Sequence, residues 1–184
     1  VVASPALVSS SCATPQTEQE DTTIIREDSG ITALKYSSPE VPSSIEFCGK
    51  VIDLSRFDRH ERMDRELLAF TYMHSTSLQM LKKANRYFPI VEPILKENGI
   101  PDDFKYLMVI ESNMNPTARS SAGAAGLWQF MQGTGRDYGL EVNNNVDERY
   151  HIEKATRAAC RYLKDAYAKY KDWVAVAASY NAGQ

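Results

Sequence analysis

Apolar residues recur three and four positions apart along most of the chain after Asp58, and this spacing constrains the fold more than any other feature of the sequence. Such a period is that of an amphipathic helix with one face in a core. We therefore predict a mainly α fold, a helical domain with a small irregular or β element. The predicted helices are Glu61–Tyr72, Ser75–Arg86 with a continuation over Tyr87–Leu95, Asp102–Glu111, His151–Tyr170 and an alanine-rich helix from Asp172 to Gly183.

The ends of these helices are marked by residues that interrupt or cap a helical backbone. Pro89 and Pro93 predict breaks or an entry turn, because proline lacks the N–H that the helix needs. Asn98-Gly99 predicts a helix end, and Asp172 predicts the N-cap of the last helix. The glycine-rich stretch from Pro116 to Gly139 predicts irregular structure, with a short hairpin around Leu127–Met131.

The N-terminal part of the chain has a different composition, rich in Ser, Thr, Pro, Glu and Asp. Such a segment buries too little apolar surface to offset the entropy that it would lose on ordering. We therefore predict a disordered or extended leader over 1–44. A linker or docking segment follows over 45–62, with Ile45–Ile52 extended, and one folded domain occupies 63–184. Because the chain lacks an initiator Met and stops at Gln184, we expect that an upstream segment was removed and that the domain is truncated.

Composition excludes several classes of function. The net charge of -3 and the pI near 5.7 provide no basic surface for nucleic acid. No run of about 18 apolar residues could span a bilayer. The cysteines lack metal-ligand spacing and the histidines are scattered, so we predict neither a metal nor another cofactor. We interpret Cys160 as a buried core residue, and a lipid anchor on Cys12 stays open as the less favoured reading.

One carboxylate stands where an apolar residue is expected. Phe104, Leu107 and Met108 follow the helical spacing, and Glu111 continues their core-facing series. Burial and the negative end of the helix dipole both disfavour the charged form, so Glu111 would hold its proton near neutral pH, as a general acid must. The other positions of this helix are also largely apolar, which predicts burial nearly all round; they include Tyr106, Val109 and Ile110. Periodicity alone slightly favours the alternative, an exposed Glu111 at a frayed helix end.

Motifs at four places in the sequence favour the buried, catalytic Glu111 over the exposed one. Together they resemble the lytic transglycosylases of the goose-type lysozyme-like superfamily, most closely the membrane-bound transglycosylase D type. The resemblance covers about Arg65 to Gln184. The motifs are Glu111-Ser112 before Asn115-Pro116, Gly126-Leu127-Trp128-Gln129-Phe130-Met131, Asp147-Glu148-Arg149, and Ala178-Ser179-Tyr180-Asn181-Ala182-Gly183.

The resemblance implies a lysozyme-like helical domain with a glycan groove, in which Glu111 is the single acid and base. Ser120 would hydrogen-bond near the reacting sugar and the glutamate. Tyr180 would orient the glutamate through its hydroxyl, and Asn181 would lie near the sugar N-acetyl group. The residues implied to hold the glycan in the groove are Gln129 and Met131. Trp128 is more simply a core residue, Met131 could be one as well, and Gly123 and Gly126 would let the backbone approach the substrate.

The activity implied is cleavage of the MurNAc-GlcNAc β-1,4 bond of peptidoglycan with formation of a 1,6-anhydro end. The implied partner is the peptidoglycan glycan strand, and the implied location is the cell envelope or periplasm, with membrane attachment through an N-terminal segment left open. Two alternatives remain: a hydrolase on the same fold, with Asp147 positioning water, and a non-catalytic glycan-binding module. Other acids near the motifs stand in polar contexts typical of caps and solvated loops; they are Asp137, Glu141 and Glu148.

Overall fold

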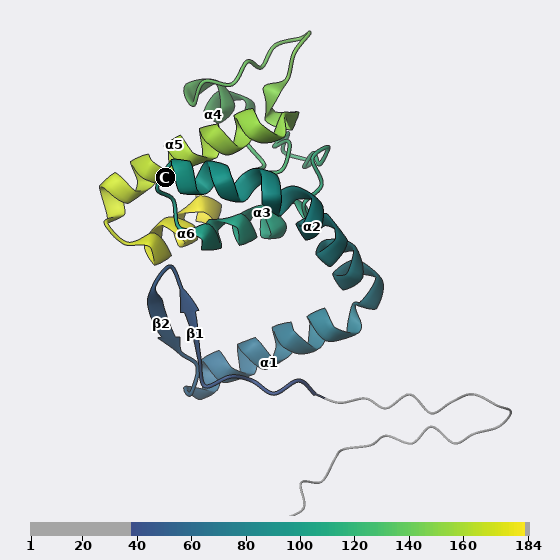
Figure 1. Cartoon of the computed structure of the whole chain (residues 1–184), viewed down its shortest axis with the longest axis vertical. Helices are drawn as coiled ribbons and strands as arrows, with labels where there is room; N and C mark the ends of the chain where they lie inside the picture. The colour runs from purple at the N-terminus through teal and green to yellow at the C-terminus, as the bar shows by residue number, and fades with distance from the viewer. Residues whose placement is uncertain (1–37, 183–184) are drawn as a thin grey trace, which may run out of the picture. The chain divides into compact units, whose positions relative to one another are not determined.

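The computed structural model describes residues 38–182, with side chains through Tyr180. Contacts divide the chain into Val1–Pro39 and Glu40–Gln184, and the description below concerns the second unit. Helices dominate it, so the predicted mainly α class is confirmed (Figure 1). The predicted leader up to residue 37, including Cys12, lies outside the described residues, as does Gly183. The elements are β1 (Ser44–Phe47), β2 (Lys50–Asp53), α1 (Phe57–Tyr72), α2 (His74–Glu97), the 3-10 helix η1 (Asp102–Phe104), α3 (Lys105–Ser112), α4 (Gln132–Asp137), the 3-10 helix η2 (Glu148–Tyr150), α5 (Ile152–Tyr170) and α6 (Trp173–Ala182).

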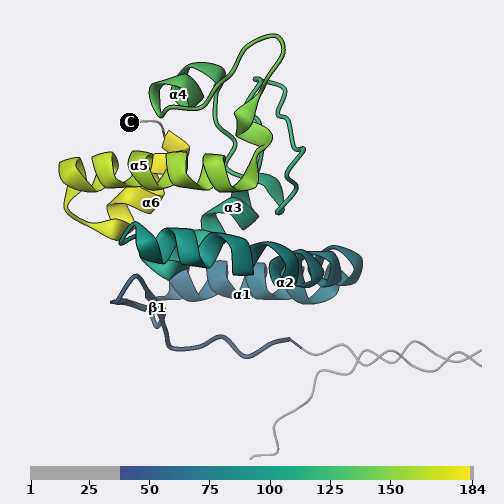
Figure 2. The same ribbon diagram turned by 45° about the horizontal axis from the view of Figure 1, so that its top comes forward.

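The hydrophobic core is centred on α5, which lies against both α2 and α6 (Figures 1 and 2). Alanines and Cys160 line the buried face of α5, and such small side chains let neighbouring helices approach closely. Val91 and Leu95 from α2 and Val176 from α6 are fully buried against them. The prediction that Cys160 is a core residue is confirmed. No helix between residues 38 and 182 is both long and apolar enough to cross a membrane.

Helix α2 continues through both prolines, so the predicted breaks at Pro89 and Pro93 are wrong. The two prolines are four residues apart and therefore share one helix face, which is solvent-exposed. Each missing N–H leaves its carbonyl partner accessible to water rather than buried. The opposite face of the same helix buries Val91 and Leu95 completely, and this packing holds the helix together across the interruption.

Helix α1 and the first half of α2 form where the periodicity predicts helices, but they contribute little to the core. All 16 residues of α1 are exposed or only half-buried, and Phe57 at its start is 82% exposed. Leu78 and Leu81 in α2 are more than half exposed. Figure 2 shows α2 between α1 on one side and α5 on the other, and the buried apolar residues of α2 lie in its second half, from Tyr87 to Leu95.

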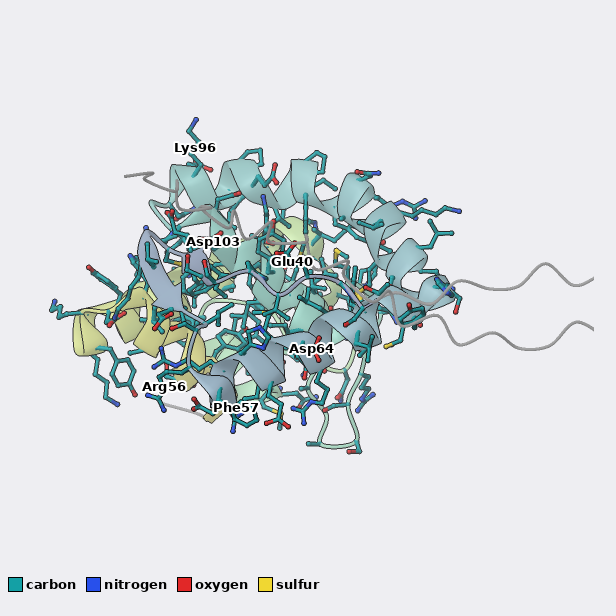
Figure 3. The ribbon with its side chains drawn as sticks, turned by 90° about the horizontal axis from the view of Figure 1, so that it is seen from below. Glu40, Arg56, Phe57, Asp64, Lys96 and Asp103 are labelled. Atoms are coloured by element: carbon teal, nitrogen blue, oxygen red, sulfur yellow. The ribbon has the colours of Figure 1, made fainter. Side chains whose placement is uncertain are left out.

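The segment predicted to be extended is an antiparallel hairpin of β1 and β2. Its two-residue turn, Cys48-Gly49, has positive φ at both positions, as the twist of a tight hairpin requires. The turn docks onto the helical part of the unit: the Cys48 amide donates to Asp103 Oδ2 at 2.6 Å, and Lys50 pairs with Asp172 at 2.8 Å. Asp103 is labelled beside the hairpin in Figure 3.

Candidate active site

Glu111 lies in the last turn of α3, at the end of the stripe that enters the core. Phe104 and Met108 on this stripe are fully buried. The prediction that the helix is buried nearly all round is wrong, because Tyr106 is 49% exposed and Ile110 is 72% exposed. Only one face of α3 meets the core, and Tyr106 instead packs at the surface against the ring of Phe88, 5.8 Å away.

The carboxyl group of Glu111 is half-buried and incompletely partnered. Its Oε1 is withdrawn from solvent and has no hydrogen-bond partner within residues 38–182. Burial raises the pKa of Glu111 above its ordinary value, because the charged form loses hydration. The alternative of a fully exposed Glu111 is therefore wrong, and the predicted tendency to hold a proton has a physical basis in the fold.

The chain reverses immediately after Glu111 through two left-handed residues. Asn113 has φ 48° and Met114 has φ 52°, a conformation that asparagine tolerates and methionine rarely adopts. Met114 is held there because its side chain is buried, and Lys83 Nζ donates to the Asn113 carbonyl at 3.0 Å. The sequence analysis missed this reversal; Asn113 after the last apolar residue of the helix was the available signal.

The loop that follows contains two closed turns, and the second, between Ala125 and Phe130, is the short hairpin predicted around Leu127–Met131. An antiparallel bridge joins Arg119 to Ala125, and a second joins Ala125 to Phe130. Between the first pair, Ser120 Oγ accepts from the Ala124 amide at 3.0 Å. The two turns use single bridges rather than a ladder, because glycines with positive φ reverse the chain too soon for strands to extend. Ser120 is exposed on this loop.

Gln129 and Met131 occupy the second turn and its exit. Gln129 has φ 49°, and its Nε2 donates to the Gly126 carbonyl at 2.8 Å and to the Ala118 carbonyl at 3.3 Å. The amide nitrogen of Gln129 therefore holds the turn together. Met131 precedes α4 and is 46% exposed, so it is not a core residue.

Trp128 connects the loop to α5 and α6. Its ring is fully buried and its Nε1 donates to Thr156 Oγ1 at 2.9 Å, so the interpretation of Trp128 as a core residue is confirmed. The Trp128 carbonyl accepts the hydroxyl proton of Tyr180 at 2.7 Å. A phenol has only one proton to donate, so Tyr180 donates none to Glu111, and its predicted orienting role stays a prediction.

Tyr180 nevertheless lies close enough to Glu111 to feel its charge. Burial raises the pKa of Tyr180 well above its ordinary value, and the negative charge of Glu111 raises it further. The structure thus brings together two of the predicted site residues, from α3 and α6. The side chain of Asn181, a third, lies outside the described residues.

Arg149 is a buried cation whose role the sequence analysis did not predict. Its Nε and Nη2 donate to the two carboxylate oxygens of Asp147, at 2.9 and 2.7 Å. Its Nη1 donates to the carbonyls of Gly123 and Phe130, both at 2.9 Å. Gly126 packs directly on the Arg149 backbone, where an added Cβ would overlap the carbonyl oxygen. Gly126 is therefore required by this contact within the protein, and its φ of 81° fits the predicted backbone permissiveness.

Nearby acids other than Glu111 are committed to structural partners. The hydrogen bond from Arg149 lowers the pKa of Asp147, and the Glu141 amide and Lys154 lower the pKa of Glu148. The polar contexts predicted for these two acids are confirmed. Two hollows of about 590 and 290 Å³ lie elsewhere on the described unit, along α2 and beside the hairpin, and Glu111 lines neither. The candidate site is therefore defined by the surroundings of Glu111.

The matches to known proteins cover the part of the chain that contains the candidate site. The family model described as "Transglycosylase SLT domain" matches residues 89–184. The membrane-bound lytic murein transglycosylase D of Escherichia coli is 31% identical over 125 residues, which is 67% of this chain and 27% of that protein. A peptidoglycan transglycosylase of Escherichia phage T7 is 33% identical over 90 residues, 47% of this chain and 7% of the phage protein. The chain thus spans about a quarter or less of the length of these two relatives.

Proposed function

Because the chain belongs to the family of transglycosylase SLT domains, with their lysozyme-like helical fold, we propose that it is a peptidoglycan lytic transglycosylase. It cleaves the MurNAc-GlcNAc β-1,4 bond and leaves a 1,6-anhydro-MurNAc end. The observation that carries the proposal is the half-buried carboxyl of Glu111, with one oxygen out of solvent and unpartnered. Such a group holds a proton at higher pH than an ordinary carboxyl does, and so can act as the acid.

In the first step, protonated Glu111 donates its proton to the glycosidic oxygen, and the bond from that oxygen to C1 of the muramoyl residue breaks. The N-acetyl oxygen of the substrate supports C1 as it loses the leaving group. Burial keeps Glu111 protonated beforehand, because the charged form loses hydration. Tyr180 gives its only proton to the Trp128 carbonyl and therefore donates none to Glu111.

In the second step, the carboxylate of Glu111 removes the proton from the muramoyl C6 hydroxyl, whose oxygen closes on C1. The acid regains its proton, no water is consumed and no cofactor takes part. The nucleophile belongs to the same sugar ring, so proximity gives it a high effective concentration. One protein carboxyl is therefore sufficient.

The remaining site residues are proposed to bind the glycan. Ser120 and Met131 are exposed on the loop 118–131 and are accessible to a sugar chain. Gln129 has its Nε2 engaged in the turn, so its carbonyl oxygen is the atom offered to the substrate. The family resemblance adds Asn181, beside Tyr180.

The hydrolase alternative requires a second acid that can hold a water molecule. Asp147 was the candidate, but both of its carboxylate oxygens accept from Arg149. A carboxylate bound in this way is a poor base, because the same contact lowers its pKa. A purely glycan-binding module would gain nothing from an unpartnered carboxyl oxygen in its groove, so the transglycosylase is preferred.

The proposed location follows from the proposed substrate. Peptidoglycan strands lie in the cell envelope, and the Escherichia coli relative is named as a membrane-bound protein. We propose the envelope or periplasm for this chain, with the domain organisation expected from the sequence: a leader over 1–44, a docking segment over 45–62 and the catalytic domain over 63–184.

The test is digestion of purified sacculi with the chain and with its Glu111→Gln variant, followed by mass spectrometry. The unchanged chain should release anhydro products, each one water lighter than a hydrolysis product. Glu111→Gln should lose cleavage by roughly 10²-fold or more, because the amide cannot donate the proton. Glu153→Gln, an exposed glutamate of α5, is the matched control and should cleave normally. Near-normal cleavage by Glu111→Gln, or hydrated products, would contradict the proposal.

The pH dependence gives a second test. Glu111 must be protonated to begin the reaction, so kcat/KM should fall as the pH rises through its pKa. Burial raises that pKa above the ordinary 4.5, so the fall should begin at higher pH than for an exposed glutamate. A decline in kcat/KM centred at or below 4.5 would exclude Glu111 as the acid.

A further inference from the structure

Hydrogen bonds and one turn of the backbone connect the guanidinium group of Arg149 to Tyr180, which lies near Glu111. The Arg149 side chain is 1% exposed, and three of its nitrogens donate. Asp147 takes two of these bonds and neutralises the charge. The third nitrogen, Nη1, points at the loop 118–131 and serves two of its carbonyls.

Those two carbonyls belong to different turns of the loop. Gly123 lies in the first turn, and Phe130 closes the second. A single nitrogen thus joins both turns. In addition, the backbone carbonyl of Arg149 lies directly against Gly126. A lysine at this position could not reproduce the arrangement, because its three donors diverge from one point and lack the planar fork.

The second turn connects the contacts of Arg149 to the candidate site through Trp128. Trp128 lies within it, fixed by its ring to Thr156 on α5, and its carbonyl holds the Tyr180 hydroxyl. The Tyr180 ring packs edge-on against Tyr162, with centroids 5.2 Å apart, so the carbonyl sets where the hydroxyl points. Tyr180 in turn lies within reach of the charge of Glu111.

We propose that Arg149, held by Asp147, is a positioning residue for the cleavage reaction: it fixes the loop so that the Trp128 carbonyl keeps Tyr180 in place beside Glu111. The inference rests on the proposed transglycosylase function and extends it to two residues that do not touch substrate. It also assigns Asp147 a role that excludes direct participation in catalysis.

The first experiment compares Arg149→Lys with Arg157→Lys in the whole chain. Arg157 is an exposed arginine of α5 that pairs with Glu97 at 2.8 Å, so it controls for the loss of a guanidinium elsewhere. We expect Arg149→Lys to lower kcat on peptidoglycan by about 10-fold or more with a smaller change in KM, because small displacements of catalytic groups are costly. The alkaline limb of its pH profile should also move. Arg157→Lys should leave both unchanged. An unaltered kcat and pH profile in folded Arg149→Lys would overturn the proposal.

A second variant covers the case in which Arg149→Lys fails to fold. Asp147→Asn keeps the shape of the side chain and one acceptor oxygen, and it leaves Arg149 free to bind the loop. We expect a decrease in kcat of about 3-fold, in the same direction and with the same shift of the pH profile. Wild-type kcat and an unmoved pH profile in folded Asp147→Asn would also count against the positioning role.

A readout independent of activity separates this inference from the proposed function. The chain has two tryptophans, so Trp173→Phe leaves Trp128 as the reporter of the loop. In that background Arg149→Lys should shift the Trp128 emission to the red and increase its quenching by acrylamide. If the unchanged chain cleaves no peptidoglycan, the proposed function fails, and this measurement still decides about the loop. Unchanged emission in Arg149→Lys would show that Arg149 does not position it.

Discussion

The last turn of α3 and the turn at η2 each withdraw an ionisable group from water, but the two groups differ in their hydrogen-bond partners. At η2 the Arg149 guanidinium donates to a carboxylate and to two backbone carbonyls. At the end of α3, Glu111 has a buried oxygen with no partner in the part of the chain that the structure describes.

The contrast shows that a buried ionisable group with hydrogen-bond partners and one without them suit different roles in the same small domain. A buried charge that is paired and fully hydrogen-bonded fixes the groups around it in one arrangement. A buried carboxyl that lacks partners is unstable when charged and therefore retains its proton. The protein uses the first to hold a loop and leaves the second incomplete, where a substrate can supply the missing partner.

The largest effect is expected from removing the buried cation of Arg149 from the half-buried carboxylate of Asp147. Arg149→Met removes every side-chain donor while keeping a long apolar side chain. Asp147 then keeps only the backbone amide of residue 149, the Phe130 carbonyl keeps only the Ala125 amide, and the Gly123 carbonyl loses its bond to Nη1. Removing one partner of a buried ion pair costs about 3–5 kcal/mol, and we expect a loss of that size in the free energy of unfolding by urea. A loss below 1 kcal/mol would mean that water already serves these groups and that the two regions differ less than described.

The next effect tests the close approach of the loop to the Arg149 backbone. Gly126→Ala adds a Cβ that overlaps the Arg149 carbonyl, at a residue with φ 81°. Backbone strain and overpacking should together reduce the free energy of unfolding by about 2–4 kcal/mol. Gly133→Ala is the control, because a Cβ there meets no atom within 4 Å and the residue lacks a positive φ. Equal stability of the two variants would contradict the contact.

The same contrast marks what could be predicted from sequence. Helices α5 and α6 follow from local spacing, which a helix preserves in space, whereas a buried Glu111 was favoured only once the motifs were added to its spacing. The hydrogen bonds of Arg149 do not follow from local spacing, because Asp147-Glu148-Arg149 has the composition of a solvated turn. Its partners Gly123 and Phe130 lie more than 18 positions away in the sequence. The acceptor of the Tyr180 proton could not be predicted for a similar reason, since the position of the Trp128 carbonyl depends on the turn of the loop.

A smaller effect of opposite sign is expected at Glu111. Its pKa in the folded state is raised, so below the ordinary value near 4.5 the group is neutral in both states and has no penalty. As the pH rises through the folded pKa, the folded protein loses stability relative to a variant that cannot ionise. Glu111→Gln should therefore gain up to about 1 kcal/mol at pH 7, a modest value because the group is only half-buried. Thermal unfolding at pH 7 and pH 4 measures this, and a gain that persists at pH 4 would assign it to another cause.

The smallest effect is expected where an arginine pairs at the surface. Arg157 and Glu97 have side chains that are 46% and 64% exposed, and their ion pair lies in water. Arg157→Met should change the free energy of unfolding less than any of the other substitutions, and 0.5 M salt should remove the difference. The loss in Arg149→Met should persist at that salt concentration, because its charges are out of reach of screening ions. If salt reduced both losses equally, the Asp147–Arg149 pair would behave as a surface pair, and the anchoring of the loop would have to come from its glycines and Trp128 instead.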